Sequence, residues 1–264
     1  MKYLVDHDYH IHSNISGCAD DPLQTPENIL KYAEDTGLKR LVLTDHFWDE
    51  DSTGDKRRIW RQYESVSFAS IKRARPLPKS DRVEFLFGCE ADMDEEFNTG
   101  IHPDHYDEFD FIVVATTHMH MWYDKSVSVK ARKKLYLDRF AALLESDLPL
   151  KKVGIAHLTC SLIANMYPNA HRDVLNLISD NEFYTLFKGV KDTGCAVELN
   201  GGSFYNETDL SDEIMRPYFL ARDCGCKFYV GNDAHILSTF KDFKPFAQKA
   251  VELLDLSEDD KFCF

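Results

Sequence analysis

The chain has 264 residues, of which 44% are hydrophobic, and its formal net charge is −14 at pH 7. This length and apolar content can fill one sizeable core, whereas the acidic charge argues against nucleic-acid or anionic-membrane partners, because those contacts need clustered Lys and Arg. The seven cysteines accompany neither a leader-like segment nor an apolar run of membrane-spanning length, so we expect reduced thiols in a cytoplasmic protein.

Short apolar runs alternate with amphipathic segments along the chain. Seven runs are predicted as strands, at residues 3–11, 40–44, 83–88, 111–117, 152–156, 196–199 and 228–230. Helices are predicted at residues 26–36, 59–73, 131–144, 180–191, 213–223 and 245–254. The first helix is the best defined, because Thr25 can cap it, Pro26 suits its first turn and Gly37 can end it. This alternation predicts an α/β fold with a mostly parallel sheet, closed into a barrel within a single domain, residues 1–264.

Every predicted strand carries His, Asp, Glu or Asn at its C-terminal end. In chain order these residues are His10 and His12, Asp45 and His46, Glu90, His118 and His120, His157, Glu198 and Asn200, and Asp233 and His235. Parallel α/β barrels build their active sites at this end, and one shared metal site explains the pattern better than seven coincidences. The set exceeds the three protein ligands of a single catalytic zinc, so we predict two or three divalent ions, Zn, Mn or Fe.

Taken in order, these motifs resemble those of the PHP (polymerase and histidinol phosphatase) domain phosphoesterases over nearly the whole chain. The matching motifs are H-x-H at His10 and His12, T-D-H at residues 44–46, G-x-E ending in Glu90, the single histidines His118 and His157, and G-x-D-x-H at residues 231–235. The resemblance implies a distorted (β/α)7 barrel with up to three metal ions. It also implies three ligand sets: His10, His12, Glu90 and Asp233 for one ion, Glu90, His118 and His157 for a second, and His46 and His235 for the third.

The third set departs from the family pattern. Many members place His or Asp six residues after the second histidine of H-x-H, where this sequence has Cys18 within the segment S-G-C-A-D-D-P. Three interpretations remain open. Cys18 could bind as a thiolate, Asp20 or Asp21 could take its place, or the third ion could bind weakly.

Several other polar residues also allow more than one role. His118 is the expected ligand because it comes first after its apolar run, while His120 would share its face if the strand continued and could contact substrate. Glu198, in a segment that resembles the family's E-L-N, could orient a ligand, contact substrate or be a polar residue of the barrel core. Asn200 could face the substrate or shape a turn. Structural or surface roles are expected for the remaining histidines, His7, His102, His105 and His171.

These features predict a metal-dependent hydrolase that acts on phosphate esters. A multinuclear site lowers the pKa of bound water, so that hydroxide can attack phosphorus in line, and it neutralises the phosphoryl oxygens. Asp45, next to His46, is expected to orient that ligand without binding the metal itself, rather than to transfer protons. There is no G-x-S-x-G elbow and no glycine-rich phosphate loop to indicate another mechanism.

The expected substrate is a small phosphomonoester, and histidinol phosphate is the family's obvious candidate. Family phosphatases often carry an arginine just after E-L-N, but this chain reads E-L-N-G-G-S-F-Y-N, so Arg132 or Arg172 would have to compensate. Arg132 belongs to the basic run at residues 130–134, which is either a solvated helix face or a patch that steers phosphate inward. Two alternatives remain: an amidohydrolase or nuclease-like barrel, which also begins with H-x-H, and a metal-binding PHP domain that has lost activity.

Overall fold

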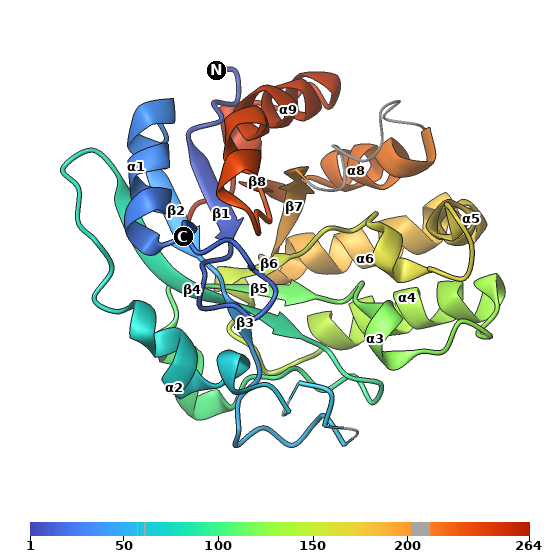
Figure 1. The fold of residues 1–264 in the computed structure, drawn as a ribbon. Coiled ribbons are helices and arrows are strands. Elements are labelled where there is room, and N and C mark those ends of the chain that lie inside the picture. The colour runs from blue at the N-terminus through green and yellow to red at the C-terminus, as the bar shows by residue number, and fades with distance from the viewer. Residues whose placement is uncertain (57, 61, 202–211) are drawn as a thin grey trace.

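The computed structural model describes residues 1–56, 58–60, 62–201 and 212–264. Its strands form one parallel sheet in the order β1-β2-β4-β5-β6-β7-β8, with β3 paired to β4 beside this path. The strands are β1 His7–Ile11, β2 Arg40–Leu43, β3 His46–Phe47, β4 Glu84–Asp92, β5 Phe111–Ala115, β6 Val153–Ile155, β7 Ala196–Asn200 and β8 Lys227–Gly231. Figure 1 shows the strands wound around a common centre with the helices outside them.

The first and last strands lie side by side and nearly close the barrel. Ile11 forms an isolated parallel bridge with Ala234, and the backbone N–H of Asp233 donates to the carbonyl of His10 over 2.7 Å. The pairing of β1 with β2 is irregular between Asp8 and Ile11. The predicted barrel of parallel strands is therefore confirmed, and β3 is a short addition that continues the chain beyond β2 along β4.

The helices cover the outside of the barrel. They are α1 Pro26–Thr36, α2 Phe68–Ile71, α3 Met119–Trp122, α4 Val129–Leu144, α5 Ala170–Leu177, α6 Asp180–Thr193, α8 Asp212–Cys224 and α9 Phe240–Leu253. The predicted ends of α1 are confirmed, because the Thr25 side chain accepts the Asn28 N–H and Gly37 adopts a left-handed φ of 73°. Among the helices of the described chain, none is long and apolar enough to cross a membrane.

The prediction of one helix at residues 59–73 is wrong. In the part of this stretch that the structure describes, only α2 and short 3-10 turns form. The carboxylate of Asp55 accepts the backbone N–H groups of Ile59 over 2.6 Å and Trp60 over 2.9 Å. A side chain that binds these amides offers the backbone an alternative to a helix.

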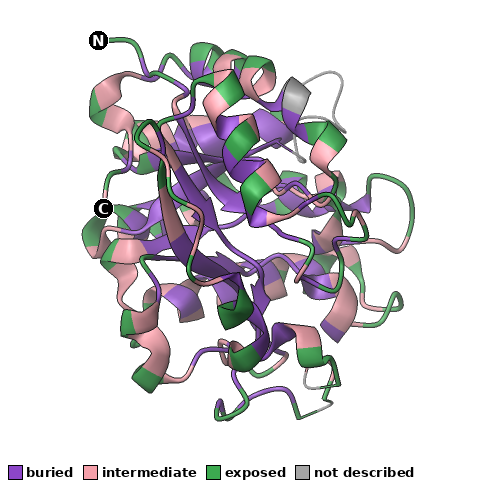
Figure 2. Cartoon of the chain, turned by 60° about the vertical axis from the view of Figure 1, so that its left-hand side comes forward, coloured by how far each residue is buried: buried purple, intermediate pink, exposed green. Residues whose placement is uncertain are grey.

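An apolar cluster fills the barrel interior away from the polar strand ends. Its buried members come from β1, β2, β5, β7 and β8, from the residue after β6 and from the C-terminal segment: Tyr9, Val42, Phe111, Val113, Ala115, Ala156, Ala196, Tyr229 and Phe262. A Cβ at Gly154 would lie 2.5 Å from the rings of Phe111 and Tyr229, so this position needs glycine. Figure 2 shows that the strands are mostly buried, while exposure is concentrated on the outer helices and loops.

Candidate metal centre

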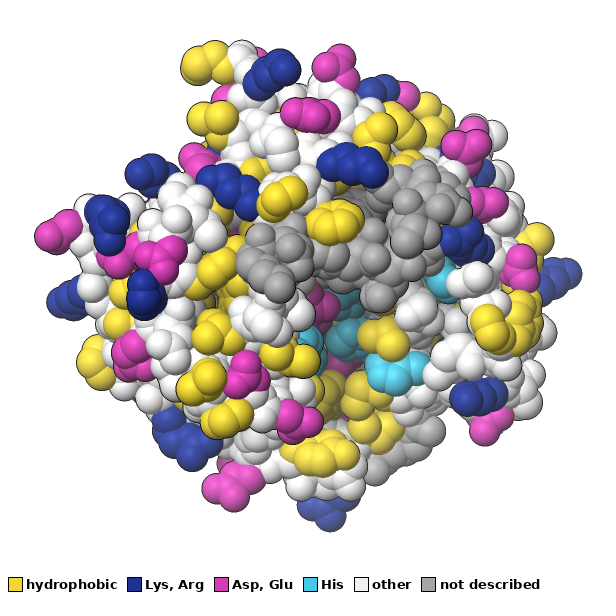
Figure 3. Space-filling model, turned by 45° about the horizontal axis from the view of Figure 1, so that its top comes forward, with side chains coloured by type: hydrophobic (Ala, Val, Ile, Leu, Met, Phe, Trp, Pro, Cys, Tyr) yellow, Lys and Arg dark blue, Asp and Glu magenta, His cyan; other side chains and the backbone are white. Residues whose placement is uncertain are grey.

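The carboxyl-terminal ends of the strands bring the predicted ligands into three groups. The groups are His10, His12 and Asp233; Glu90, His118 and His157; and His12, Cys18, His46 and His235. Within each group the candidate ligand atoms all lie within 4.8 Å of one another. Figure 3 shows histidine side chains recessed in a hollow on this face of the molecule. The division resembles the one that the family resemblance implies, but His12 belongs to two groups, Cys18 joins His46 and His235, and Glu90 is grouped only with His118 and His157.

Glu90 lies at the centre of the groups and faces them with both oxygens. Its Oε2 is 2.9 Å from His46 Nδ1, 3.4 Å from His12 Nε2 and 3.6 Å from His10 Nε2. Its Oε1 is 3.2 Å from His157 Nε2 and 3.9 Å from His118 Nε2. Burial acts to raise the pKa of this carboxyl, but His46 and His10 hold it well below its usual range. A carboxylate placed between separate sets of imidazoles is suited to bridge two ions.

Glu198 forms hydrogen bonds with two of the histidines. Its Oε1 accepts the Nδ1–H of His10 over 2.7 Å, and its Oε2 accepts the backbone N–H of His157 over 2.6 Å. A Cβ at Gly231 would lie 2.0 Å from Glu198 Oε1 and 2.6 Å from His10 Cβ, so only glycine leaves room for this pair. Fixing Nδ1 in this way directs His10 Nε2 toward Glu90. Of the roles considered for Glu198, this geometry favours orientation of a ligand.

Thr117 and Asp92 orient two further histidines, and sequence reasoning missed both. Thr117 Oγ1 lies 2.7 Å from His157 Nδ1, and Asp92 Oδ2 accepts from His118 Nδ1 over 3.0 Å. Asp92 follows Glu90 by two residues on β4, so strand alternation places both carboxylates on the same face. That spacing was the available signal. Thr117 has no signal beyond its position next to His118.

Two of the predicted ligands have unusual backbone conformations. His157 has a φ of 26° and Asp233 a φ of 55°, values that residues with a Cβ rarely adopt. Asp233 is held there by its N–H bond to His10, and its own carbonyl accepts the Nδ1–H of His235 over 2.8 Å. Strained conformations of this kind cluster at functional sites, where surrounding contacts impose them.

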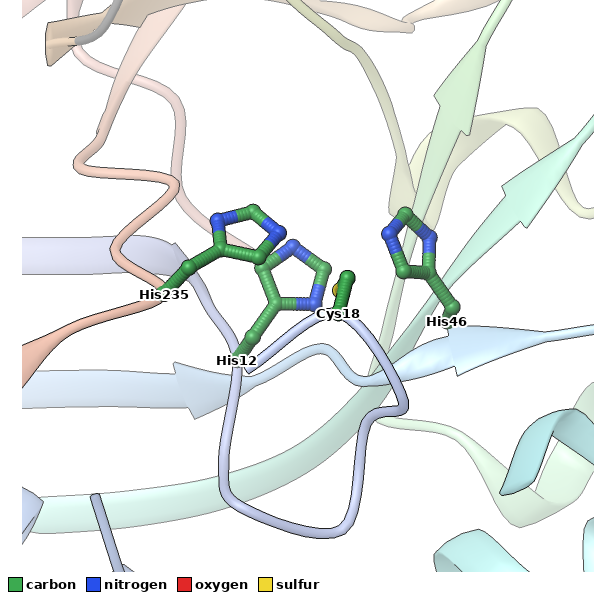
Figure 4. Close-up of side chains that lie close together, drawn as sticks. All are labelled: His12, Cys18, His46 and His235. Atoms are coloured by element: carbon green, nitrogen blue, oxygen red, sulfur yellow. The ribbon is translucent and has the colours of Figure 1, made fainter. Parts of the chain in front are cut away.

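The loop between β1 and α1 brings Cys18 to the third group. Figure 4 shows His12, His46 and His235 around Cys18. Ser16 Oγ accepts the backbone N–H of His46 over 3.2 Å, and the Gln24 amide donates to the carbonyls of His12 and Ala234. These bonds tie the loop to β1, β3 and the segment after β8.

Cys18 fits this group better than its two acidic alternatives. Asp21 Oδ1 accepts the N–H of Leu23 and Oδ2 accepts the N–H of Leu237, while Asp20 is exposed and belongs to none of the three groups. Desolvation acts to raise the pKa of the Cys18 thiol, but hydrogen bonds from His235 and His46 lower it to about 6. The arrangement therefore favours the thiolate among the three interpretations.

The buried polar atoms of the centre fit divalent ions. His10 Nε2, His12 Nδ1 and Glu90 Oε2 are inaccessible to solvent and have no hydrogen-bond partner among the described residues. Buried polar atoms normally have such a partner. Imidazole and carboxylate donors suit Zn, Mn or Fe, so bound ions would satisfy these atoms.

Asp45 supports the centre indirectly. Its carboxylate accepts both the N–H and the Oγ–H of Ser13, over 2.6 and 2.7 Å. Ser13 follows His12, so Asp45 fixes the backbone beside that ligand rather than its own neighbour His46. Burial raises the pKa of Asp45 to about 7 despite these two hydrogen bonds.

The prediction for Arg132 needs correction, and the strand face that His120 was expected to share with His118 does not form, while a substrate contact by His120 stays a prediction. The strand ends at Ala115, so His120 lies on α3 and not on a strand face, with its ring 5.7 Å from that of His118. Arg132 is fully buried on α4. Its guanidinium donates to backbone carbonyls of Met119, Tyr123, Asp124 and Ile163. Because its Nη groups are occupied in this way, the structure gives no support to a phosphate contact by Arg132.

The remaining candidates belong to none of the three groups. Asn200 is buried at the end of β7, in register with Gly231, and most of the G-G-S-F-Y-N segment after it lies outside the described residues. Arg172 lies on α5. His7 has a structural role, since its Nε2 accepts the N–H of Val230 over 3.0 Å. In the basic run, Lys133 pairs with Glu182 over 2.8 Å, as expected for a solvated helix face.

Comparison with solved structures supports the fold. A histidinol phosphate phosphatase from Lactococcus lactis subsp. lactis, solved in complex with zinc, L-histidinol and phosphate, superposes with a TM-score of 0.58 at 15% identity, covering 99% of this chain and 100% of that one. A putative histidinol phosphatase from Listeria monocytogenes also gives a TM-score of 0.58, at 13% identity, covering 88% and 96%. No curated protein sequence matches significantly.

The family follows from the sequence itself. The profile of the PHP domain matches residues 8–263, a span that includes every residue of the three groups. The solved neighbours agree in fold over nearly the same length. This chain belongs to the PHP domain family.

Proposed function

We propose that the chain hydrolyses a small phosphomonoester with the help of two or three divalent transition-metal ions. The position of Glu90 carries the proposal, because its two oxygens face different sets of histidines at 2.9 to 3.9 Å. Bound ions would lower the pKa of a water molecule and neutralise charge on phosphoryl oxygens.

The residues of the chain would hold and orient this centre. His10, His12 and Asp233 would bind one ion, His118 and His157 a second, and Glu90 would bridge the two. His46, His235 and Cys18 would bind the third. Glu198, Thr117 and Asp92 fix the Nδ1 side of their histidines, which directs the Nε2 atoms toward the centre.

Histidinol phosphate is the first substrate to test. The Lactococcus lactis neighbour was solved with L-histidinol and phosphate, and the net charge of −14 disfavours long polyanions. Because Arg132 is occupied by backbone carbonyls, we propose that the ions themselves, rather than an arginine, neutralise most of the substrate phosphate.

A cytoplasmic location suits this centre. All seven cysteines are free, and a reducing compartment preserves thiols. Cys18 is exposed, so an oxidising environment would threaten a proposed ligand.

The test is hydrolysis by protein reconstituted with Zn, Mn or Fe. We expect release of inorganic phosphate from small phosphomonoesters, histidinol phosphate included, and loss of that activity with a chelator. Phosphodiesters, polynucleotides and amides serve as competing substrates. Faster cleavage of amides or polynucleotides would support the hydrolase alternatives, and no hydrolysis by protein with bound ions would support a domain without activity.

A further inference from the structure

The third group differs from the other two in the chemistry of its donors. We propose that Cys18 makes the group of His12, Cys18, His46 and His235 a thiolate site, which selects zinc or a similarly soft divalent ion over manganese. The proposal rests on the proposed metal-dependent function and adds which ion the third group prefers.

The four side chains converge from separate parts of the chain. His12 follows β1, Cys18 lies in the next loop, His46 begins β3 and His235 follows β8. Their candidate ligand atoms lie within 4.8 Å of one another. The loop is fixed by the bond from the His46 N–H to Ser16 Oγ, two residues before the cysteine. The thiol is thus part of a built cluster and not an isolated surface cysteine.

The other groups each contain a carboxylate, from Asp233 or from Glu90, whereas this group contains none. The nearby acid Asp21 is occupied by the N–H groups of Leu23 and Leu237. Glu90 Oε2 lies 2.9 Å from His46 Nδ1 and 3.4 Å from His12 Nε2, and Asp233 Oδ1 lies 3.1 Å from His12 Nε2, but the donors of the group itself are nitrogen and sulfur.

Donor type determines which ion such a group prefers. Carboxylates suit Mn and Mg, imidazoles suit Zn, Cu and Fe, and thiolates strongly favour soft ions such as Zn. His46, His235 and Cys18 supply nitrogen and sulfur donors of the kinds that bind zinc in proteins, and His12, which also belongs to the first group, lies beside them. A protein that holds Mn or Fe in its carboxylate groups would therefore still take zinc at the third.

Cobalt(II) provides a direct spectroscopic test on the full-length, metal-free protein. Cobalt bound to a thiolate gives a near-ultraviolet charge-transfer band that nitrogen and oxygen ligands do not give. We expect this band to develop during titration of the native chain and to be absent from Cys18→Ser. In parallel, equal zinc and manganese are supplied, and bound metal is measured by elemental analysis. Cys18→Asp should reduce the preference for zinc over manganese by about 10- to 100-fold, the range by which loss of a residue that only orients a ligand lowers metal affinity.

Two other cysteines provide matched controls. Cys263→Ser removes an exposed thiol near the C-terminus and should keep the band. Cys160 lies three residues after His157, whose carbonyl accepts its N–H, so Cys160→Ser tests the competing thiol and should keep the band as well. Circular dichroism checks that each variant is folded, and Cys18→His retains a ligand without sulfur if Cys18→Ser does not fold.

The outcomes separate this proposal from the proposed function. A band that survives in Cys18→Ser, or that disappears in Cys160→Ser, overturns the role of Cys18. Native protein that binds metal and hydrolyses phosphomonoesters without showing the band has the proposed function but not the thiolate site. Protein that binds no cobalt at all contradicts both.

Discussion

The two ends of the barrel are built on opposite principles. At the amino-terminal end, aromatic rings fill the interior: Phe111 lies 5.1 Å from the ring of Tyr229, 5.6 Å from that of Tyr9 and 4.9 Å from that of Phe264. At the carboxyl-terminal end, Glu90 and most of the histidines around it are also buried, yet several of their polar atoms have no hydrogen-bond partner in the described part of the chain. At the amino-terminal end apolar packing dominates, although the buried Tyr229 Oη has no hydrogen-bond partner among the described residues, whereas at the carboxyl-terminal end bound ions would satisfy the polar atoms.

This difference predicts that residues at one end of the barrel mainly determine stability, whereas residues at the other end mainly determine metal binding. Close-packed rings contribute to the free energy of unfolding whether or not a ligand is present. Clustered imidazoles and carboxylates are costly to bury unless they are compensated. We call the amino-terminal end around Phe111 the closed end and the carboxyl-terminal end around Glu90 the open end. Changes at the closed end should reduce stability with little effect on metal binding, and changes at the open end should do the reverse.

Glu90→Gln should have the largest effect. The amide keeps the shape of the side chain but loses the charge that faces histidines of all three groups. We expect kcat/KM for phosphomonoesters to fall on the order of 100- to 1000-fold, comparable to removal of one catalytic donor. Elemental analysis should show a larger loss of metal than any single histidine substitution causes.

Glu84→Gln is the matched control on the same strand. Glu84 lies at the opposite end of β4, exposed and paired with Arg40 over 2.6 Å, and a surface pair of this kind contributes at most about 1 kcal/mol. Metal content should not change in this variant. If Glu84→Gln and Glu90→Gln lost metal equally, the two ends of the barrel would not be distinct.

Phe111→Ala should have the largest effect on stability. Truncation of a fully buried phenylalanine costs about 3–5 kcal/mol, measured as the change in free energy of unfolding in urea. The folded protein should still bind the native number of ions, since Phe111 lies at the closed end. Tyr184→Ala on α6, where the side chain is exposed, should change stability by less than about 1 kcal/mol. Loss of metal from folded Phe111→Ala protein would contradict the separation.

Glu198→Gln tests whether Glu198 orients the metal ligands at the open end. Glu198 binds His10 Nδ1 and the His157 N–H, and substitution of such an orienting partner typically lowers metal affinity about 10- to 100-fold. Competition with a chelator measures the affinity. An unchanged affinity would show that Glu198 is only a polar residue of the barrel core, the alternative that its sequence left open.

The parts of the structure that could be predicted depend on local patterns. Apolar runs set the strands, and in a parallel barrel the residues after them must meet at one end, so the positions of His10, Glu90 and Asp233 followed from spacing. The capped helix α1 was predictable for the same reason, because Thr25 and Gly37 are local signals.

Tertiary contacts decided what could not be predicted. Nothing in the basic run indicates that Arg132 points inward to bind carbonyls while Lys133 pairs at the surface. The loop after β3 has a helical pattern, but Asp55 captures its backbone N–H groups. Thr117 acquires a role only when His157 arrives from another strand.

Asp6→Asn should have the smallest effect on stability, and the pH dependence of that effect tests how the Asp6 charge contributes at the closed end. Asp6 Oδ1 lies 3.3 Å from His7 Nδ1 and 3.1 Å from Lys261 Nζ, and Lys261 also pairs with Glu258 over 2.9 Å. The hydrogen bond from His7 is the main cause that lowers the pKa of Asp6 to about 2, from 3.8, while burial opposes it and Lys261 assists. Burial also lowers the pKa of His7 itself.

A folded-state pKa below the unfolded value means that the Asp6 charge stabilises the protein above about pH 4, and that this contribution is lost as the pH falls through about 2. Asp6 is 38% exposed, so we expect Asp6→Asn to cost less than about 1 kcal/mol at neutral pH. Urea unfolding of both proteins at several pH values should show the difference shrinking between about pH 4 and pH 2. Asp35→Asn, at a more exposed pair with Lys31, should cost even less. A difference that stayed constant down to pH 2 would mean that Asp6 stabilises the closed end through its hydrogen-bonding shape rather than its charge.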